Sequence, residues 1–198
     1  KALRLHSSSR ERLSFYEELY RQIFFRSGVP STILDVGCGL NPFSLPFMRL
    51  PPVQYTALDL NDEDCVLVKI FFRHLPRGSL LRGTVWCDDI TNPATLQRIS
   101  QRSSFDVCFL FKMAEVVERK KGHALFEALL RTIPTCYFVV SFSTKTLSSK
   151  HMRQPERRWF TLLLKRLGWA WSSFETENEL FYVIRKAETI LQAKATQT

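Results

Sequence analysis

Hydrophobic and polar residues alternate between two patterns along most of this 198-residue chain. Short runs are apolar almost throughout, as in parallel strands buried on both faces, and the segments between them repeat apolar residues at helical spacing. The strand-like runs are residues 32–36, 54–58, 81–86, 105–111 and 136–142. The helix-like segments between them are residues 62–75, 91–99 and 115–132. This alternation predicts a parallel sheet with helices on both faces.

The first part of the chain has the pattern of an amphipathic helix. Ser8 and Glu11 have the spacing of a capping box, and apolar residues then recur at helical intervals. Gly28 and Pro30 are typical of residues that follow the end of a helix. We therefore predict a helix over residues 9–27.

The last part of the chain departs from the alternation. A helix is predicted over residues 153–167, and two strands, residues 169–175 and 179–185, then follow with only a short polar turn between them. Strands joined so closely must be antiparallel, because a parallel return needs a crossover of a dozen residues or more. Five parallel strands and this hairpin make a seven-stranded α/β sheet in a three-layer sandwich. The arrangement resembles the class I methyltransferase fold, which is Rossmann-like, and differs from the all-parallel dinucleotide-binding sheet.

Two glycines follow the first predicted strand. Gly37 and Gly39 allow the backbone to turn sharply and to approach a ligand without a Cβ in the way. The second strand ends in Asp59, where a carboxylate can accept hydrogen bonds from both ribose hydroxyls of a nucleoside cofactor. NAD competes for this geometry, but its fingerprint needs glycine in place of Pro42, which lacks the N–H that a pyrophosphate would use. S-adenosylmethionine carries no phosphate and tolerates the proline; without any cofactor, the segment is a structural turn.

The third and fourth strands lead into further candidate residues. Asp88, Asp89 and Ile90 follow the third strand, where a carboxylate can accept from the exocyclic amine of adenine and an apolar side chain can pack on the ring. The alternative for either aspartate is an N-cap of the next helix. The fourth strand ends in Phe111 and Lys112 and lacks an Asn/Asp-Pro-Pro-aromatic motif. That absence argues against an exocyclic amine of adenine or cytosine as the methyl acceptor.

Several segments together resemble one family, the aminoglycoside-resistance 16S ribosomal RNA methyltransferases that methylate N7 of a guanine. LHSSSRERL at residues 5–13 is similar to the family's LHxSTxERL, and ILDVGCGLNP at residues 33–42 is close to its ILDxxCGLNP. FKMAEVVER at residues 111–119 resembles FKxxxxxER, and SFSTKTL at residues 141–147 resembles SFPTxSL. NELFYVIRK at residues 178–186 matches the closing strand. Members usually have Pro where Ser143 stands and a glycine-rich basic loop in place of residues 148–152.

The resemblance implies methylation of a guanine in the decoding-site helix of 16S rRNA, in the small ribosomal subunit, and hence aminoglycoside resistance. It also implies that Arg12 reaches the carboxylate end of S-adenosylmethionine; a surface helix arginine is the alternative. The predicted cofactor-binding residues are Arg12, Asp35, Gly37, Cys38, Gly39, Asn41, Pro42, Asp59, Leu60, Asp88, Asp89, Ile90 and Phe111. The family also has an N-terminal helical domain that helps to grip the subunit. We see no counterpart here and expect this chain to be the catalytic part.

On this interpretation residues 1–30 form an N-terminal helix leading into the catalytic domain, residues 31–187 form that domain, and residues 188–198 form a flexible tail. Guanine N7 carries a free lone pair at neutral pH, so its methylation needs alignment and no general base. The target base is expected to flip out of its helix and to stack on an aromatic side chain. We hypothesise that Phe111 helps to form the base pocket and that Lys112 anchors the base edge or a phosphate. The alternatives are core packing for Phe111 and a solvated strand end for Lys112.

The charge of the chain suits a polyanionic partner. Lys and Arg number 28 against 19 Asp and Glu, which gives a formal net charge of +9. Such an excess favours binding to phosphates through counterion release, although a merely basic protein has the same composition. The predicted RNA-binding residues, around the loop after the fifth strand, are Lys145, Lys150, Arg153 and Arg157. A solvated helix face is the alternative for Arg157.

Cysteine usage and hydropathy exclude other classes. The five cysteines include no CxxC pair and the four histidines are scattered, which argues against a metal site and against a disulfide framework. No uninterrupted apolar stretch is long enough to span a membrane. We expect a monomeric protein of the reducing cytoplasm, without metal or membrane contact. Two other functions remain open: a methyltransferase of the same class that acts on a small molecule or a protein, and a non-catalytic module that binds cofactor or ribosome.

Overall fold

The structure, a computed structural model, describes residues 11–76, 81–118, 123–145, 152 and 154–187. Its strands are β1 (Thr32–Val36), β2 (Gln54–Asp59), β3 (Arg82–Cys87), β4 (Phe105–Phe111), β5 (Thr135–Ser143), β6 (Ala170–Glu175) and β7 (Glu179–Arg185). Its helices are α2 (Tyr16–Ser27), η2 (Asn41–Ser44), α3 (Leu45–Met48), α4 (Asp62–Arg73), α5 (Pro93–Ser100), α6 (Met113–Val117), α7 (Ala124–Thr132) and α8 (Arg158–Leu167). The strands match the predicted ranges to within one residue at each end.

All seven of these strands form one sheet, in the order β3-β2-β1-β4-β5-β7-β6. Strands β1 to β5 pair in parallel, whereas β7 pairs antiparallel with both β5 and β6. The predicted sheet with a closing antiparallel hairpin is therefore confirmed. Because β7 runs backwards, its first residue, Glu179, lies opposite Ser143, the last residue of β5. An antiparallel strand thus contributes a side chain to the edge at which the parallel strands end.

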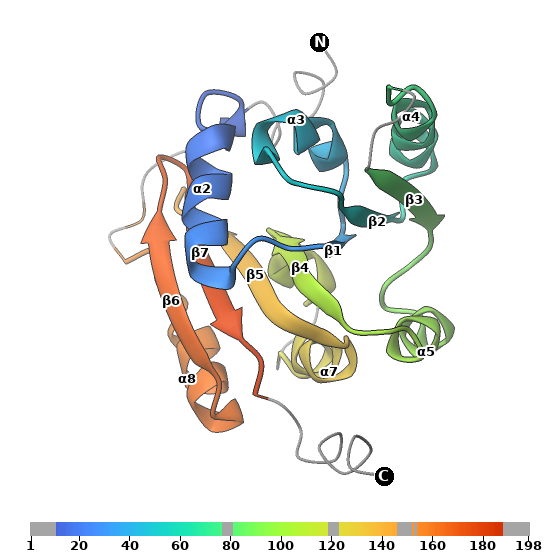
Figure 1. Cartoon of the computed structure of the whole chain (residues 1–198). Helices are drawn as coiled ribbons and strands as arrows, with labels where there is room; N and C mark the ends of the chain where they lie inside the picture. Colours follow the sequence, from blue (N-terminus) through green and yellow to red (C-terminus); the bar gives the residue numbers. More distant parts are fainter. Residues whose placement is uncertain (1–10, 77–80, 119–122, 146–151, 153, 188–198) are drawn as a thin grey trace, which may run out of the picture.

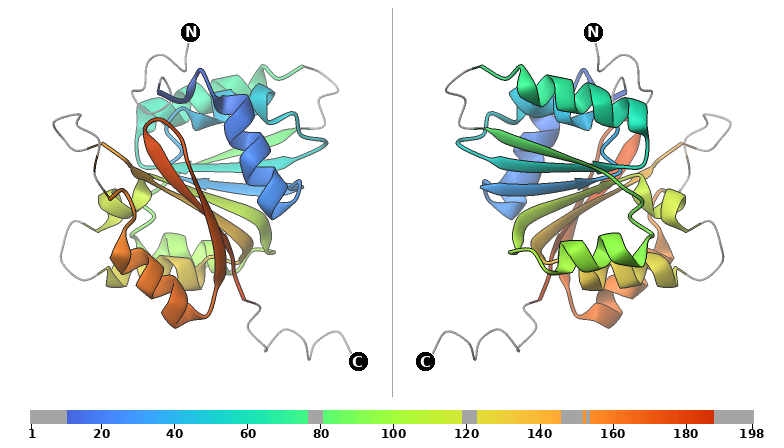
Figure 2. Two further views of the ribbon diagram at one scale, coloured as in Figure 1. Left: turned by 90° about the vertical axis from the view of Figure 1, so that its left-hand side faces the viewer. Right: turned by 90° about the vertical axis from the view of Figure 1, so that its right-hand side faces the viewer.

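Helices cover both faces of the sheet (Figures 1 and 2). Helices α2, α3 and α4 lie on one face, and α5, α7 and α8 lie on the other. Buried side chains form one cluster on each face, because successive residues of a strand point to opposite sides. In β4, for example, Phe109 packs in the cluster with Tyr20 of α2, and Leu110 packs in the cluster with Phe160 of α8. The strands are thereby fixed from both sides, and their carboxyl ends form a rigid edge.

The predicted helix over residues 9–27 is wrong in its first part. Arg12 is helical, but residues 13–15 form a turn and α2 begins only at Tyr16. The Phe15 N–H donates to the Arg12 carbonyl oxygen at 3.0 Å, a tighter spacing than that of an α-helix. Arg12 is only 2% exposed because its side chain is bound by a residue of β7, and such tertiary contacts override helix propensity. Residues 9 and 10 lie outside the described residues.

Two further helix predictions were too long. The helix predicted over residues 115–132 is divided between α6 and α7, because Glu118 leaves the helical conformation with φ of −92° and ψ of 63°. The Glu118 carboxylate then accepts from the Phe126 N–H at 2.7 Å, so the residue that follows α6 caps α7. The helix predicted over residues 153–167 begins at Arg158, because Arg157 has an extended backbone with φ of −91° and ψ of 93°.

Candidate active site

The loop after β1 depends on glycine. Gly37 and Gly39 have φ values of 65° and 46°, in the left-handed region that other residues rarely adopt. A Cβ placed on Gly37 would lie 2.0 Å from the sulfur of Met113, the first residue of α6. Gly37 therefore allows the loop after β1 to pass directly against α6. The sharp turn predicted from the two glycines is confirmed.

Asp59, the last residue of β2, fastens this loop. One carboxylate oxygen accepts from the Gly39 N–H at 2.7 Å and the other accepts from the Asn61 N–H at 2.9 Å. An ionised carboxylate offers about four acceptor positions, so each oxygen retains capacity for a hydroxyl donor. Asp59 thus positions the glycine loop and still presents acceptors to a ligand.

Two cavities lie on either side of Gly37 and Asp59, which line both of them. The first cavity, of about 200 Å³, is polar; the second, of about 690 Å³, is lined mainly by apolar groups. The first is lined by Arg12, Asp35, Gly37, Cys38, Gly39, Asn41, Asp59, Asn61, Asp64 and Phe111. The second includes Leu60, Asp88, Asp89, Ile90, Met113 and Val117. Every predicted cofactor-binding residue except Pro42, which is buried at the start of η2, therefore lines one cavity or the other.

A buried hydrogen-bond network supports the floor of the polar cavity. Asp35, near the end of β1, accepts from the Tyr55 hydroxyl and from the Asn41 side-chain amide. The Tyr20 hydroxyl contacts Asn41 at 3.2 Å and Ser44 at 2.6 Å, which joins α2 to η2. Burial raises the pKa of Asp35 to about 6, although the hydrogen bonds from Tyr55 and Asn41 oppose this shift. The network fixes the glycine loop by holding β1, before the loop, and η2, after it, against their neighbours.

The two aspartates after β3 have different partners. Asp88 pairs with Arg98 of α5, and Asp89 accepts from the backbone N–H and the hydroxyl of Thr91. The N-cap of α5 is Asn92, which accepts from the Ala94 N–H at 3.0 Å. The alternative that Asp88 or Asp89 caps this helix is therefore wrong, and contact with a cofactor stays a prediction for both.

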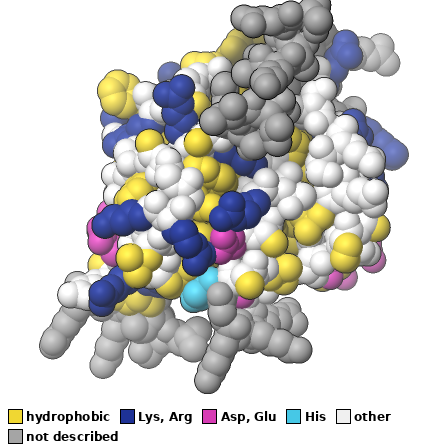
Figure 3. Space-filling view, turned by 90° about the horizontal axis from the view of Figure 1, so that it is seen from below, with side chains coloured by type: hydrophobic (Ala, Val, Ile, Leu, Met, Phe, Trp, Pro, Cys, Tyr) yellow, Lys and Arg dark blue, Asp and Glu magenta, His cyan; other side chains and the backbone are white. Residues whose placement is uncertain are grey.

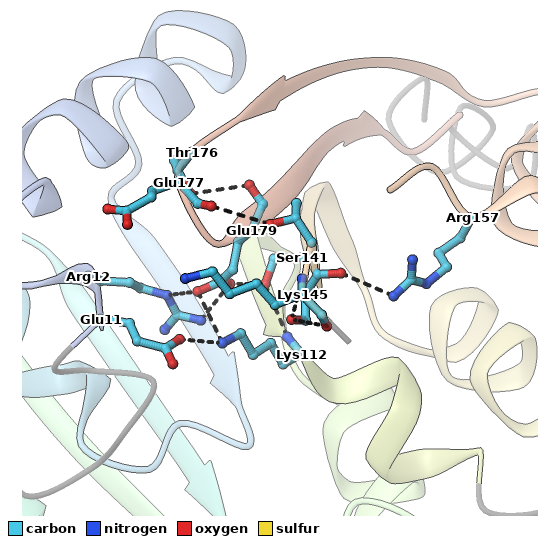
Figure 4. Close-up of polar contacts among 11 residues, drawn as sticks. Glu11, Arg12, Lys112, Ser141, Lys145, Arg157, Thr176, Glu177 and Glu179 are labelled. Carbon is cyan, nitrogen blue, oxygen red and sulfur yellow. Dashed lines mark hydrogen bonds and ion pairs between the residues drawn. The ribbon is translucent and has the colours of Figure 1, made fainter. Parts of the chain in front are cut away.

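Charged side chains meet at the ends of β4, β5 and β7 (Figure 4). Arg12 donates through Nε and Nη2 to the two carboxylate oxygens of Glu179 at 2.7 and 2.8 Å. Lys112 Nζ lies 2.9 Å from Glu11 and 3.6 Å from Glu179. The guanidinium of Arg12 also lies over the ring of Phe111, 4.8 Å from its centre. The candidate catalytic residues thus lie in one network with the predicted cofactor ligand Arg12.

This network decides between some of the alternatives left by the sequence. Arg12 is not a surface helix arginine, because it is buried and lines the polar cavity. Lys112 is not a solvated strand end, because its side chain is 26% exposed and lies between two carboxylates. Phe111 both packs in the core and lines the polar cavity. Contact of these residues with a cofactor or a base stays a prediction.

The predicted RNA-binding residues are only partly described. Lys150 and Arg153 lie outside the described residues. Lys145 follows β5, and its side chain extends toward the network around Glu179 in Figure 4. Ser143, where family members usually have Pro, closes the turn there by donating to the Lys145 carbonyl oxygen at 3.0 Å.

Arg157 is bound more tightly than a solvated helix residue. Its guanidinium donates to carbonyl oxygens of Ser143 and Pro155 and pairs with Glu115 at 3.1 Å, which leaves the side chain 17% exposed. Arg157, which directly precedes α8, therefore ties the start of this helix to the end of β5 and to α6. The interpretation as a solvated helix face is wrong, and a contact with RNA phosphate stays a prediction.

Lys and Arg side chains also gather on the face of the molecule that carries α5, α7 and α8 (Figure 3). Helices α7 and α8 carry cations in their last turns, namely Arg131 in α7 and Lys165 and Arg166 in α8. Glu127 pairs with both Arg131 and Arg166. Cations at the carboxyl end of a helix complement its dipole. These three cations therefore have a structural explanation that needs no phosphate.

Sequence reasoning missed three residues of the site. Glu179 lies within the NELFYVIRK segment that matches the family, so the resemblance held a usable signal for it. Met113 stands at a variable position of FKMAEVVER, and Tyr55 lies outside every motif. Their roles follow from the close approach of α6 to Gly37 and from the hydrogen bond to Asp35, which only the fold reveals.

The described residues hold no group of three or more His, Cys, Asp or Glu that is arranged to bind a metal ion. All five cysteines have free thiols. Among the helices of the described part of the chain, none has the length and apolar character needed to cross a membrane.

The strand order and the site at the carboxyl ends of β1 and β2 define a class I methyltransferase fold. Residues 1–183 match the family model of the ribosomal RNA methyltransferase (FmrO) family, and the chain belongs to this family.

Individual relatives agree with this assignment. A 16S rRNA (guanine(1405)-N(7))-methyltransferase of Frankia casuarinae is 29% identical over 189 residues, which are 94% of this chain and 63% of that protein. The solved structure of the 16S rRNA methylase ArmA has a TM-score of 0.76 at 27% identity and covers 93% of this chain and 89% of its own. The 16S rRNA methyltransferase RmtF, solved in complex with S-adenosyl-L-homocysteine, has a TM-score of 0.66 at 25% identity, covering 93% of this chain and 67% of its own. The chain thus spans less than two thirds of the Frankia relative.

Proposed function

We propose that this chain transfers a methyl group from S-adenosylmethionine to N7 of a guanine in the decoding-site helix of 16S rRNA, within the small ribosomal subunit. Membership of the ribosomal RNA methyltransferase family supports the reaction class. The observation that carries the proposal is the pair of cavities that meet at Gly37 and Asp59, with Phe111 lining the polar one.

The residues present fit this cofactor, which supplies a methyl group activated by a sulfonium centre. Arg12 lines the polar cavity and offers a cation to the carboxylate of the amino-acid end. Asp59, between the cavities, offers acceptors to the ribose hydroxyls. Ile90 lines the larger cavity and offers an apolar surface to the adenine. Pro42 agrees with a ligand that has no pyrophosphate, because it removes an N–H at the start of η2.

Methylation of guanine N7 requires the protein mainly to position the base. Guanine N7 has no proton to lose, so the residues at the end of β4 need only hold the base in line with the methyl group and exclude water. Phe111 lines the polar cavity and forms part of the wall of the base pocket. The Lys112 ammonium, at the same strand end, offers a donor to the O6 edge of guanine or to a phosphate. A cation near O6 orients the base without blocking N7.

The substrate assignment comes from relatives. The Frankia relative is named for methylation of guanine N7 in 16S rRNA, and the structures similar to this chain include 16S rRNA methylases. We propose the same substrate for this chain, acting as a monomer in the cytoplasm, and with it resistance to aminoglycosides that bind the decoding site.

The decisive experiment incubates the protein with labelled S-adenosylmethionine and, separately, intact small subunits, free 16S rRNA and a mock extract. We expect label in the small subunits, at N7 of one guanine of the decoding-site helix. Labelling at another ring position, or labelling of protein or small molecules only, would contradict the proposal.

A pair of variants connects this activity to the described site. Asp59→Ala should abolish binding of S-adenosylhomocysteine in calorimetry, because it removes the acceptors between the two cavities. Glu63→Ala, an exposed carboxylate in the first turn of α4, should leave binding unchanged. Equal binding by both variants would show that the ligand lies elsewhere.

A further inference from the structure

A single buried carboxylate joins the two cations of the candidate site (Figure 4). Glu179 accepts from Arg12 at 2.7 and 2.8 Å and from the Ser141 hydroxyl at 2.7 Å, and Lys112 Nζ lies 3.6 Å away. Arg12 lines the polar cavity, whereas Lys112 follows Phe111 at the end of β4. Glu179 is therefore the common partner of the residue proposed to bind cofactor and the residue proposed to hold the base.

The charge of Glu179 is held by these partners. The residue is 0% exposed, and a carboxylate so deeply buried is strongly destabilising unless it is paired. Burial alone would raise the pKa of Glu179, but Arg12 and Lys112 lower it below its ordinary value, so the carboxylate is ionised. Arg12 alone would neutralise it. Lys112 is a second cation beside Glu179, and it pairs with Glu11 as well.

The backbone of Lys112 is tied to the same carboxylate. Lys112 has a φ of 58°, a left-handed conformation that is unfavourable for any residue with a Cβ. Its N–H lies 3.1 Å from both the carbonyl oxygen and the hydroxyl oxygen of Ser141, and that hydroxyl donates to Glu179. Strained backbone of this kind concentrates at functional sites. The main chain of Lys112 is thus linked to Glu179 through Ser141, and its side chain lies between Glu179 and Glu11.

We infer that Glu179 is a positioning residue for methyl transfer, which fixes the Lys112 ammonium relative to Arg12 and so sets the acceptor base against the methyl donor. This inference rests on the proposed function. Glu179 also has an electrostatic effect, because N7 methylation leaves a positive charge on the guanine. An unpaired Lys112 would oppose that charge, whereas Glu11 and Glu179 balance Arg12 and Lys112.

The test compares Glu179→Gln with Glu177→Gln, which removes an exposed carboxylate two residues away. At saturating cofactor, kcat on small subunits should fall on the order of 100-fold in Glu179→Gln, as for a misplaced reacting group, and should not change in Glu177→Gln. The double variant Lys112→Ala/Glu179→Gln should have the kcat of Lys112→Ala alone. If Glu179→Gln lowered kcat by the same factor in the Lys112→Ala background as in the wild-type protein, Glu179 would act through overall structure. That result would overturn the inference.

Two additions keep the test decisive. Glu179→Gln leaves Arg12 with a buried, unbalanced charge. Glu179→Asp is therefore measured as well, because it keeps the negative charge but draws the carboxylate away from Arg12 and Lys112. A wild-type kcat in Glu179→Asp would overturn the inference. The rate at which an acetylating reagent modifies Lys112 Nζ, followed by mass spectrometry, needs no turnover. It should rise in both Glu179 variants, and an unchanged rate would count against the inference. Absence of transfer by the wild-type protein would instead contradict the proposed function, and the acetylation rate would still test Glu179.

Discussion

Gly37→Ala is the substitution for which the structure predicts the clearest effect. The new Cβ would lie 2.0 Å from the Met113 sulfur and 2.9 Å from the neighbouring Met113 carbons, so the Met113 side chain must move. The left-handed φ of 65° adds about 1–2 kcal/mol for a residue with a Cβ, and overpacking against Met113 adds about 1–3 kcal/mol. The free energy of unfolding should therefore fall by about 2–5 kcal/mol, measured as a shift of the urea midpoint at constant slope. Because Gly37 lines both cavities, binding of S-adenosylhomocysteine should weaken as well.

Gly168→Ala is the matched control. Gly168 has a nearly equal φ of 68°, but a Cβ there meets nothing within 4 Å, so only the backbone strain applies. The difference between the two variants isolates the contact with Met113. In a Met113→Ala background, Gly37→Ala should therefore lower stability by no more than Gly168→Ala does. If Gly37→Ala and Gly168→Ala were equally stable and bound the ligand equally well, the close packing of the glycine loop on α6 would be refuted.

Three other predictions follow from the site. The pKa of Asp35 is about 6 in the folded protein and 3.8 when exposed, so the wild-type protein loses stability as the pH rises from 4 to 6. Asp35→Asn should therefore be more stable than wild type, by a free energy of unfolding that grows over this range and reaches about 3 kcal/mol. A pH-independent difference in urea midpoints would contradict this. Lys112→Ala should lower methylation far more than affinity for S-adenosylmethionine, and equal losses in kcat and calorimetric affinity would argue against a role at the acceptor. RNA binding should weaken steeply as the salt concentration rises. Lys145→Ala should reduce the slope of the logarithm of the RNA-binding constant against log salt by about 1, whereas Lys165→Ala on α8 should leave the slope unchanged. Methyl transfer that is insensitive to salt would favour a small molecule or a protein as the substrate.

Much of the sheet was predictable because its strands are continuous apolar runs between polar segments. The run ending in Phe111 has the length of β4, since a strand buried on both faces leaves little choice of residue. The glycine loop and Asp59 were predictable for a related reason, because each occupies a strand end where backbone freedom or an acceptor is required. Requirements of this kind are local, so they can be predicted from the residues next to one another in the sequence.

The helix ends and the charged network were not predictable in the same way. Glu118 continues the helical pattern of its neighbours, yet its carboxylate is used to cap α7. Asp88 and Asp89 are adjacent and chemically alike, but one pairs with Arg98 and the other closes a turn at Thr91. Such choices depend on which residues the fold brings near, and a hydrophobic pattern carries no information about them.

The ion pair between Arg12 and Glu179 joins residues that are 167 positions apart. Glu179 is the first residue of β7, so this contact can form only when nearly all of the described chain is present. During synthesis on the ribosome, the wall of the polar cavity is consequently incomplete until β7 has emerged and joined the sheet. A nascent chain that ends after β5 lacks Glu179, the buried carboxylate that holds Arg12 beside the polar cavity.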